Sequence, residues 1–283
     1  MKKLSILLIL SLLAALFAGC NGNQQSQVAA TTSAVYQFTQ AICADTGISV
    51  TKLVTESVSC LHDYSLNVRQ VQAINAAEVI VISGGGLEDA FMADALNGKN
   101  VIDSAAGIEL AVREEGSREA DSHIWLSPSL AKQMAQNICQ GLSKQYPDQK
   151  DNFEKNLQKL IGQFDELQAY GESKLSQLSC RKMITFHDGF GYFADAFDLT
   201  ILRSIEEESG SEASAKELEE IIDLVREHQL PAIFTETNGS AVSAHTIKSE
   251  TGVEVYALDM CMGNLDYFAA MRRNIDTVKE ALG

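Results

Sequence analysis

The chain has 283 residues, of which 46% are hydrophobic and 21% are charged, and its formal net charge is −16. This is the composition of an ordinary globular protein, and the length suits one large domain or two of moderate size. A strongly acidic protein repels nucleic acid, so the charge argues against nucleic-acid binding and is compatible with a cationic ligand.

The first twenty residues, MKKLSILLILSLLAALFAGC, have the pattern of an export signal. Two lysines precede about fifteen apolar residues, which is too short and wrongly flanked for a membrane span. Cys20 follows the small residues directly, as in the lipobox of bacterial lipoproteins. We therefore predict a signal peptide over residues 1–19, acylation of Cys20 and a flexible polar tether over residues 20–32. An ordinary signal peptide with a chance cysteine is the alternative.

The first half of the mature chain alternates between helical and strand-like patterns. We predict helices over residues 34–47, 67–77, 86–96 and 127–146, and strands over residues 48–55, 78–85 and 100–105. Strands that alternate with helices favour a mostly parallel sheet flanked by helices. The prediction is an N-terminal α/β lobe over residues 33–147.

A long amphipathic helix is predicted next, over residues 148–178, after Pro147. Its apolar positions recur every three or four residues, at Phe153, Leu157, Leu160, Ile161, Phe164, Leu167 and Leu175. At 1.5 Å per residue such a helix spans roughly 45 Å, the length of a whole domain. It therefore looks like a stiff connection between two lobes.

The second half repeats the alternation without repeating the sequence. Strands are predicted over residues 181–186, 200–205, 231–237 and 253–259, and helices over residues 189–199, 214–230, 240–252 and 264–282. Ser214 and Glu217 have the spacing of a capping box at the start of the second of these helices. The prediction is a second α/β lobe over residues 179–283.

Three of the five histidines stand in loops or at the ends of predicted elements: His62, His123 and His187. Asp259 ends a predicted strand, and ligands of open α/β sheets bind beyond the carboxyl ends of strands. Three imidazoles and a carboxylate are a set of ligands that zinc favours. The spacing alone leaves open whether each histidine is a ligand or an ordinary packed or solvated side chain.

A family resemblance bears on that choice. From about residue 30 to its end, the chain resembles the cluster A-I metal-binding lipoproteins of ABC importers, which take up zinc or manganese. The stretches that carry the resemblance occur in the family's order: SCLHDYSL, VIVISGGGLEDAF, DSHIWLSP, ITFHDGFGYFADAFDL, IFTETNGS and ETGVEVYALD. The resemblance implies two lobes joined by one long helix, with a metal in the cleft held by His62, His123, His187 and Asp259.

The resemblance also indicates which metal and which neighbouring side chains matter. Manganese-favouring members tend to have glutamate where this chain has His187, and imidazole suits zinc, so zinc is favoured over manganese. Asp63, Asp121, Asp188 and Glu236 lie near the ligand segments and are candidates to orient the imidazoles. Trp125 is interpreted as packing that fixes the loop of His123. Cys60 departs from the family pattern and either pairs with Cys43 or offers a soft thiolate, a structural role being favoured.

We therefore predict a monomeric solute-binding lipoprotein, not an enzyme, on the outer face of the cell membrane (facing the periplasm in a Gram-negative cell). It would capture zinc, or manganese as the alternative, and deliver it to the permease of an ABC transporter, with small loop rearrangements rather than a large hinge closure. A surface adhesin role of the same lipoprotein is one alternative. An extracellular zinc hydrolase is another, opposed by the lack of HExxH and by four protein ligands that would close the site.

Overall fold

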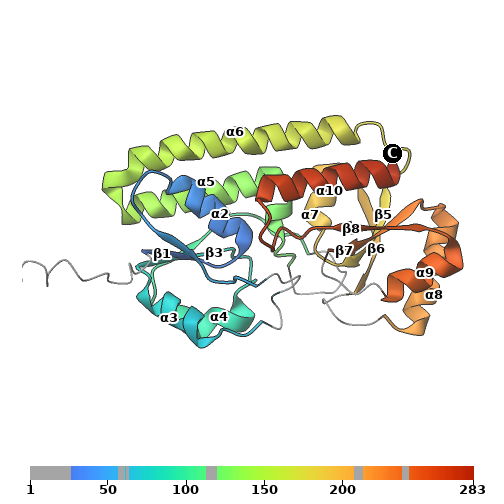
Figure 1. The fold of residues 1–283 in the computed structure, drawn as a ribbon, viewed down its shortest axis with the longest axis horizontal. Helices are drawn as coiled ribbons and strands as arrows, with labels where there is room; N and C mark the ends of the chain where they lie inside the picture. Colours follow the sequence, from blue (N-terminus) through green and yellow to red (C-terminus); the bar gives the residue numbers. More distant parts are fainter. Residues whose placement is uncertain (1–26, 57–60, 62–63, 113–119, 207–212, 238–241) are drawn as a thin grey trace, which may run out of the picture.

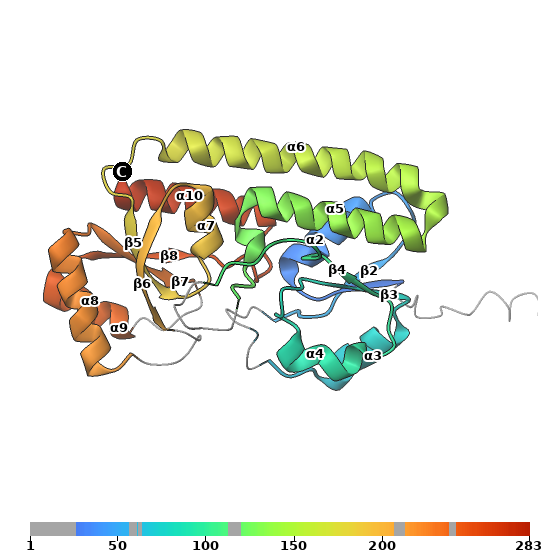
Figure 2. The same cartoon turned by 180° about the vertical axis from the view of Figure 1, so that it is seen from behind.

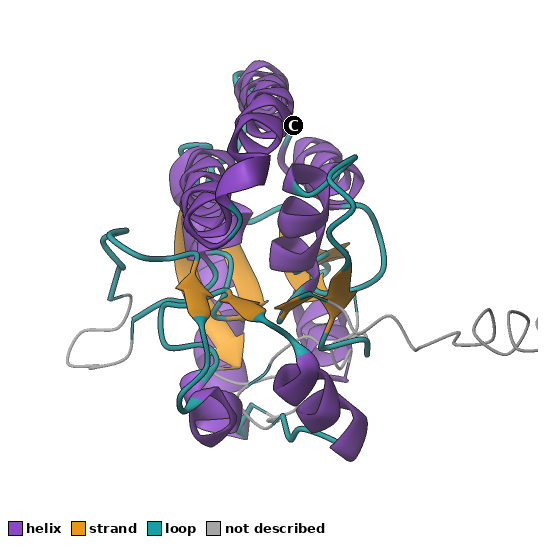
Figure 3. Ribbon diagram, turned by 90° about the vertical axis from the view of Figure 1, so that its left-hand side faces the viewer, coloured by secondary structure: helices purple, strands orange, loops and turns teal. Residues whose placement is uncertain are grey.

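Two four-stranded sheets and one long helix between them organise the protein. The computed structural model describes residues 27–56, 61, 64–112, 120–206, 213–237 and 242–283. Every strand pairing in both sheets is parallel, and each sheet has helices on its two faces (Figures 1 and 3). The predicted architecture of two parallel α/β lobes joined by a long helix is confirmed.

The N-terminal sheet has the order β2-β1-β3-β4. Its strands are β1 (Val28–Ala30), β2 (Val50–Lys52), β3 (Val79–Ile82) and β4 (Val101–Asp103). Helices α2 (Ser33–Ile42) and α5 (Pro128–Gln145) cover one face, and α3 (Val68–Ala76) and α4 (Asp89–Leu96) cover the other (Figure 1). Short 3-10 turns, η1 (Ile124–Leu126) and η2 (Pro147–Gln149), precede and follow α5.

The tether prediction for residues 20–32 is wrong at its C-terminal end. Val28–Ala30 form β1, an interior strand that pairs with both β2 and β3. All three residues are buried, and the chain then enters α2, where the Thr32 hydroxyl accepts a hydrogen bond from the Val35 N–H. Three small apolar residues after a polar run carry too little periodicity to mark a strand, and the neighbouring strands stabilise it instead.

The C-terminal sheet has the order β6-β5-β7-β8. Its strands are β5 (Lys182–His187), β6 (Thr200–Glu206), β7 (Ala232–Glu236) and β8 (Glu254–Leu258). Helices α7 (Gly191–Ala196) and α10 (Tyr267–Leu282) lie on one face, and α8 (Ala215–His228) and α9 (Val242–Thr251) on the other (Figures 1 and 2). The predicted capping box at Ser214 and Glu217 is present at the start of α8.

Helix α6 (Lys150–Leu175) runs along one side of the molecule, parallel to its long axis (Figures 1 and 2). It packs on α2 and α5 of the first lobe and on α10 of the second. One continuous hydrophobic core follows it, in which Phe38, Phe164 and Tyr267 meet edge to face. Of the helices the structure describes, none combines the length and the apolar character needed to cross a membrane.

Candidate metal centre

His123 stands at the start of η1, on the N-terminal side of the junction between the lobes. Its Nδ1 lies 3.0 Å from Asp121 Oδ1, and its backbone N–H donates to the same oxygen at 2.9 Å. Both residues are buried, His123 with 5% of its surface exposed. One carboxylate therefore fixes the main chain and the ring of His123 together.

His187 is the last residue of β5, on the C-terminal side of the junction. Its Nδ1 lies 3.5 Å from Oε1 of Glu236, which ends the neighbouring strand β7. His187 is 1% exposed and Glu236 5% exposed. Because parallel strands end at one edge of the sheet, the sequence places this imidazole and this carboxylate side by side.

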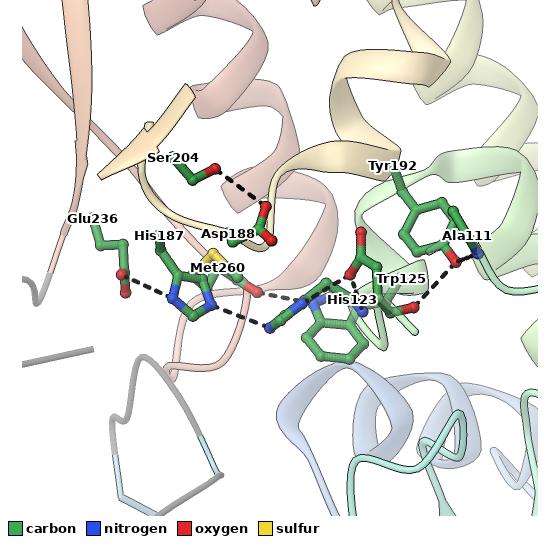
Figure 4. Close-up of polar contacts among 10 residues, drawn as sticks. Ala111, His123, Trp125, His187, Asp188, Tyr192, Ser204, Glu236 and Met260 are labelled. Atoms are coloured by element: carbon green, nitrogen blue, oxygen red, sulfur yellow. Dashed lines mark hydrogen bonds and ion pairs between the residues drawn. The ribbon is translucent and has the colours of Figure 1, made fainter. Parts of the chain in front are cut away.

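The two imidazoles face each other through their Nε2 atoms, which are 3.3 Å apart (Figure 4). The ring planes are perpendicular, with centroids 5.0 Å apart. A carboxylate beside each Nδ1 favours the tautomer that carries its proton there, which leaves the Nε2 lone pair for a metal. The pair can therefore offer two nitrogen donors to one cation, one from each lobe.

Aromatic side chains cross the junction and hold these loops in place. The Trp125 Nε1–H donates to the Met260 carbonyl at 2.9 Å, and the Tyr267 hydroxyl donates to the Trp125 carbonyl at 2.7 Å. From α7, the Tyr192 hydroxyl accepts from the Ala111 N–H at 2.9 Å and donates to the Asp121 carbonyl at 3.1 Å. Trp125 is fully buried, in keeping with its interpretation as packing.

The other residues predicted for the site do not contact the His123–His187 pair in any interaction that the structure describes. Asp259 follows β8 directly, and its Oδ1 accepts from the Cys261 N–H at 2.7 Å, while its backbone is held by the Asn274 amide. Asp188 accepts from the Ser204 hydroxyl at 3.1 Å (Figure 4). His62 and Asp63 lie outside the described residues, as does Cys20. Within the described part of the chain, no three His, Cys, Asp or Glu side chains are grouped closely enough to hold a metal ion.

One buried side chain beside the imidazoles was missed by the sequence analysis. The Met260 methyl carbon and the His187 ring flank Gly189: a β-carbon on residue 189 would lie 2.6 Å from Met260 Cε and 2.9 Å from His187 Nε2. The thioether and the imidazole are therefore neighbours, as Figure 4 also shows. The available signal was the run Met-Cys-Met directly after Asp259.

Cys60 lies outside the described residues, and Cys43, its possible partner, has a free thiol in the structure. Cys43 is buried, and burial raises the pKa of its thiol to about 12, with a smaller contribution from Cys139. A thiol with so high a pKa stays protonated and unreactive at neutral pH. Of the described cysteines, Cys139, Cys180 and Cys261 are also free.

Comparison with known proteins places these features in a family context. Residues 28–281 match the family described as zinc-uptake complex component A, periplasmic. The chain is 29% identical to the zinc-binding lipoprotein AdcA of Streptococcus pneumoniae, in an alignment that covers 99% of this chain and 61% of that protein. It is 28% identical to the high-affinity zinc uptake system protein ZnuA of Bacillus subtilis, with 99% and 98% covered.

Comparison with solved structures finds the same family. A crystal structure of ZnuA matches with a TM-score of 0.81 and 31% sequence identity, covering 90% of this chain and 98% of that one. The chain spans less than two thirds of the streptococcal relative but nearly all of the one from Bacillus subtilis. The likeness therefore extends over the whole of both lobes.

Proposed function

This chain belongs to the zinc-uptake complex component A family, and from that premise we propose that it is the extracytoplasmic solute-binding component of an ABC metal importer. It captures one divalent transition metal between its lobes and delivers it to a membrane permease. It is a binding protein and not an enzyme. Zinc is the favoured cargo, with manganese as the weaker alternative.

The observation that carries this proposal is the pair of opposed imidazoles. His123 and His187 come from different lobes, their Nε2 atoms are 3.3 Å apart, and a buried carboxylate stands beside the Nδ1 of each ring. Neutral imidazole suits zinc, whereas manganese prefers oxygen ligands. Such a pair supports transient capture of zinc in a site that both lobes must form together.

The full ligand set we propose is His62, His123, His187 and Asp259. Four protein ligands suit a closed tetrahedral zinc site without an open position for a reacting water. Asp121 and Glu236 would orient the two imidazoles of the described pair. The relatives' names, which specify zinc binding and zinc uptake, support zinc as the cargo.

The proposed location is the outer face of the cell membrane, with acylated Cys20 as the anchor. The chain resembles a lipoprotein at its N-terminus, and one relative is named a zinc-binding lipoprotein. Acylation would hold the protein near its permease without a membrane span. The binding lobes would then work as a monomer on a short tether.

Zinc titration of the purified protein tests the proposal. Wild type should bind one zinc per chain in competition with a fluorescent chelator. His123→Ala and His187→Ala should each weaken binding by more than the roughly 10–100-fold that loss of a partner outside the ligand set costs. His245→Ala is the matched control, because His245 is exposed on α9. Full affinity in either ligand variant, or no stoichiometric binding by wild type, would refute the proposal.

A further inference from the structure

Three sulfur-bearing residues, Met260, Cys261 and Met262, directly follow the last proposed zinc ligand, Asp259. All three are buried, each with 4% of its surface exposed. The zinc ligands proposed above are imidazoles and a carboxylate, so they give this sulfur no part in binding. All three side chains belong to the hydrophobic core, and zinc capture by the proposed ligands gives none of their sulfur atoms a role.

The Met260 side chain lies against the His187 imidazole. Both pack over Gly189, where a β-carbon would come within 2.6 Å of the Met260 methyl and within 2.9 Å of His187 Nε2. In Figure 4 the Met260 sulfur is drawn beside the His187 ring. The Nε2 atom of that ring is the one that faces His123. The end of the Met260 side chain therefore lies near the His187 nitrogen that faces His123.

The peptide unit that follows Met260 is hydrogen-bonded at both its carbonyl and its N–H, so this position is built rather than incidental. Its carbonyl accepts the Trp125 indole N–H at 2.9 Å. The next N–H, that of Cys261, donates to Asp259 Oδ1 at 2.7 Å, and the Cys261 thiol donates to the Asp259 carbonyl at 3.8 Å. The Met260 side chain is thus the one in the run that the contacts place beside the His187 imidazole.

A thioether is a neutral, soft donor. Soft sulfur ligands select monovalent copper, imidazole also binds copper, and hard cations such as manganese prefer oxygen. We propose that Met260 supplies a third donor, with the His123 and His187 imidazoles, through which the same site binds monovalent copper. This inference rests on the proposed function in one respect, that the two imidazoles are metal ligands.

Anaerobic titration with cuprous ion tests the inference. Wild type, Met260→Leu and Met262→Leu compete for copper with bicinchoninate, and zinc affinity is measured on the same preparations. Leucine conserves volume, so the fold should survive, which thermal unfolding checks. We expect Met260→Leu to lose at least about tenfold in copper affinity, by comparison with losses known for ligand partners, with its zinc affinity unchanged. Met262→Leu, equally buried two residues on, is the matched control and should behave as wild type.

Unchanged copper affinity in Met260→Leu would overturn the inference and leave zinc capture standing. Copper binding that depends on Met260 in a protein that does not bind zinc would overturn the proposed function instead. Because the imidazoles are shared, zinc and copper should displace each other, and simultaneous binding would also overturn the inference. X-ray absorption at the copper edge gives a reading independent of folding: wild type should show copper–sulfur scattering, and its absence would refute a thioether ligand.

Discussion

The indole of Trp125 donates its N–H to the backbone carbonyl of Met260 at 2.9 Å, which joins the loop carrying His123 to the loop that follows β8. The same ring meets His123 edge-on, with centroids 5.4 Å apart. The Tyr267 hydroxyl secures the other side by donating to the Trp125 carbonyl. Trp125 therefore acts as a clamp between the two lobes, next to the proposed donors His123 and His187.

Trp125→Phe should lower the free energy of unfolding by about 1–3 kcal/mol, because the buried Met260 carbonyl loses its donor. Zinc binding should weaken as well, since the two loops are no longer held in register. Urea unfolding followed by circular dichroism measures the first effect and chelator competition the second. A variant as stable as wild type would show that the indole hydrogen bond is not a clamp.

Tyr192→Phe should weaken zinc binding by roughly tenfold, a typical effect of losing a partner outside the ligand set. The hydroxyl bonds the Ala111 N–H and the Asp121 carbonyl, and Asp121 in turn holds His123. Tyr170→Phe is the control, because its hydroxyl, on α6, donates to the exposed Asp276 of α10 and not to a site residue. Equal losses of zinc affinity in the two variants would contradict a positioning role for Tyr192.

Zinc loading should leave the radius of gyration unchanged. The rings of Phe38, Phe164 and Tyr267 pack edge to face across α2, α6 and α10, with centroids 4.9 to 5.9 Å apart. A large rotation of one lobe would pull this shared core apart, and buried aromatic packing is expensive to lose. Small-angle scattering of the chelator-treated and zinc-loaded protein measures the radius. A clear decrease of the radius of gyration on zinc loading would contradict the prediction that the lobes keep their relative positions.

Sequence patterns predicted the fold well because its signals are local. The length of the apolar run VIVI predicts the buried strand β3, and the spacing of the apolar residues in α6 predicts which face of that helix is buried. The strand β1 could not be predicted this way, because three small residues have no period and depend on strands on both sides. The boundary of the first lobe was therefore placed too late in the chain.

The sequence predicted the arrangement of the site only where its residues stand at the ends of neighbouring strands. His187 and Glu236 end neighbouring parallel strands, so their proximity follows from topology. Asp188 is next to His187 in sequence yet bonds Ser204, because successive residues point in different directions. The approach of Tyr192 to Asp121 depends on how the lobes dock. The approach of Met260 to His187 lies within the C-terminal lobe and depends on the path of the loop after β8, and no local pattern encodes either contact.

Stability should vary with pH through Glu88, which is 1% exposed and accepts from the Thr31 hydroxyl and from the Ser83 and Gly84 N–H groups. Burial raises the pKa of this carboxyl above its ordinary value of 4.5, and the hydrogen bonds offset this in part. The folded state then binds more protons than the unfolded state between those two pKa values. The contribution of protonated Glu88 to the stability of the fold is complete below pH 4.5, and it is lost as the pH rises through the raised pKa of the folded state.

Glu88→Gln removes that titration, so urea unfolding across this range compares the two proteins directly. Wild type should lose stability relative to the glutamine variant as pH rises from 4.5 towards neutrality. At pH 4.5 the free energy of unfolding of the variant should be about 1–3 kcal/mol lower than that of wild type, because its amide N–H₂ faces a backbone N–H that then lacks an acceptor. A constant difference in unfolding free energy across the range would show that Glu88 does not titrate as its burial implies.

Gly189→Ala should weaken zinc binding without unfolding the protein. The added methyl would lie 2.6 Å from both the His187 ring and the Met260 methyl, so the imidazole has to shift, and misplacing a proposed ligand should cost affinity. Gly162→Ala is the control: a β-carbon there meets nothing within 4 Å, and the residue is inside α6. That change should leave zinc affinity alone and add about 0.5–1 kcal/mol of stability, because alanine favours a helix over glycine. Zinc titration and thermal unfolding of both variants separate the two effects, and a Gly189→Ala protein with wild-type affinity would show that the imidazole is not confined by Gly189.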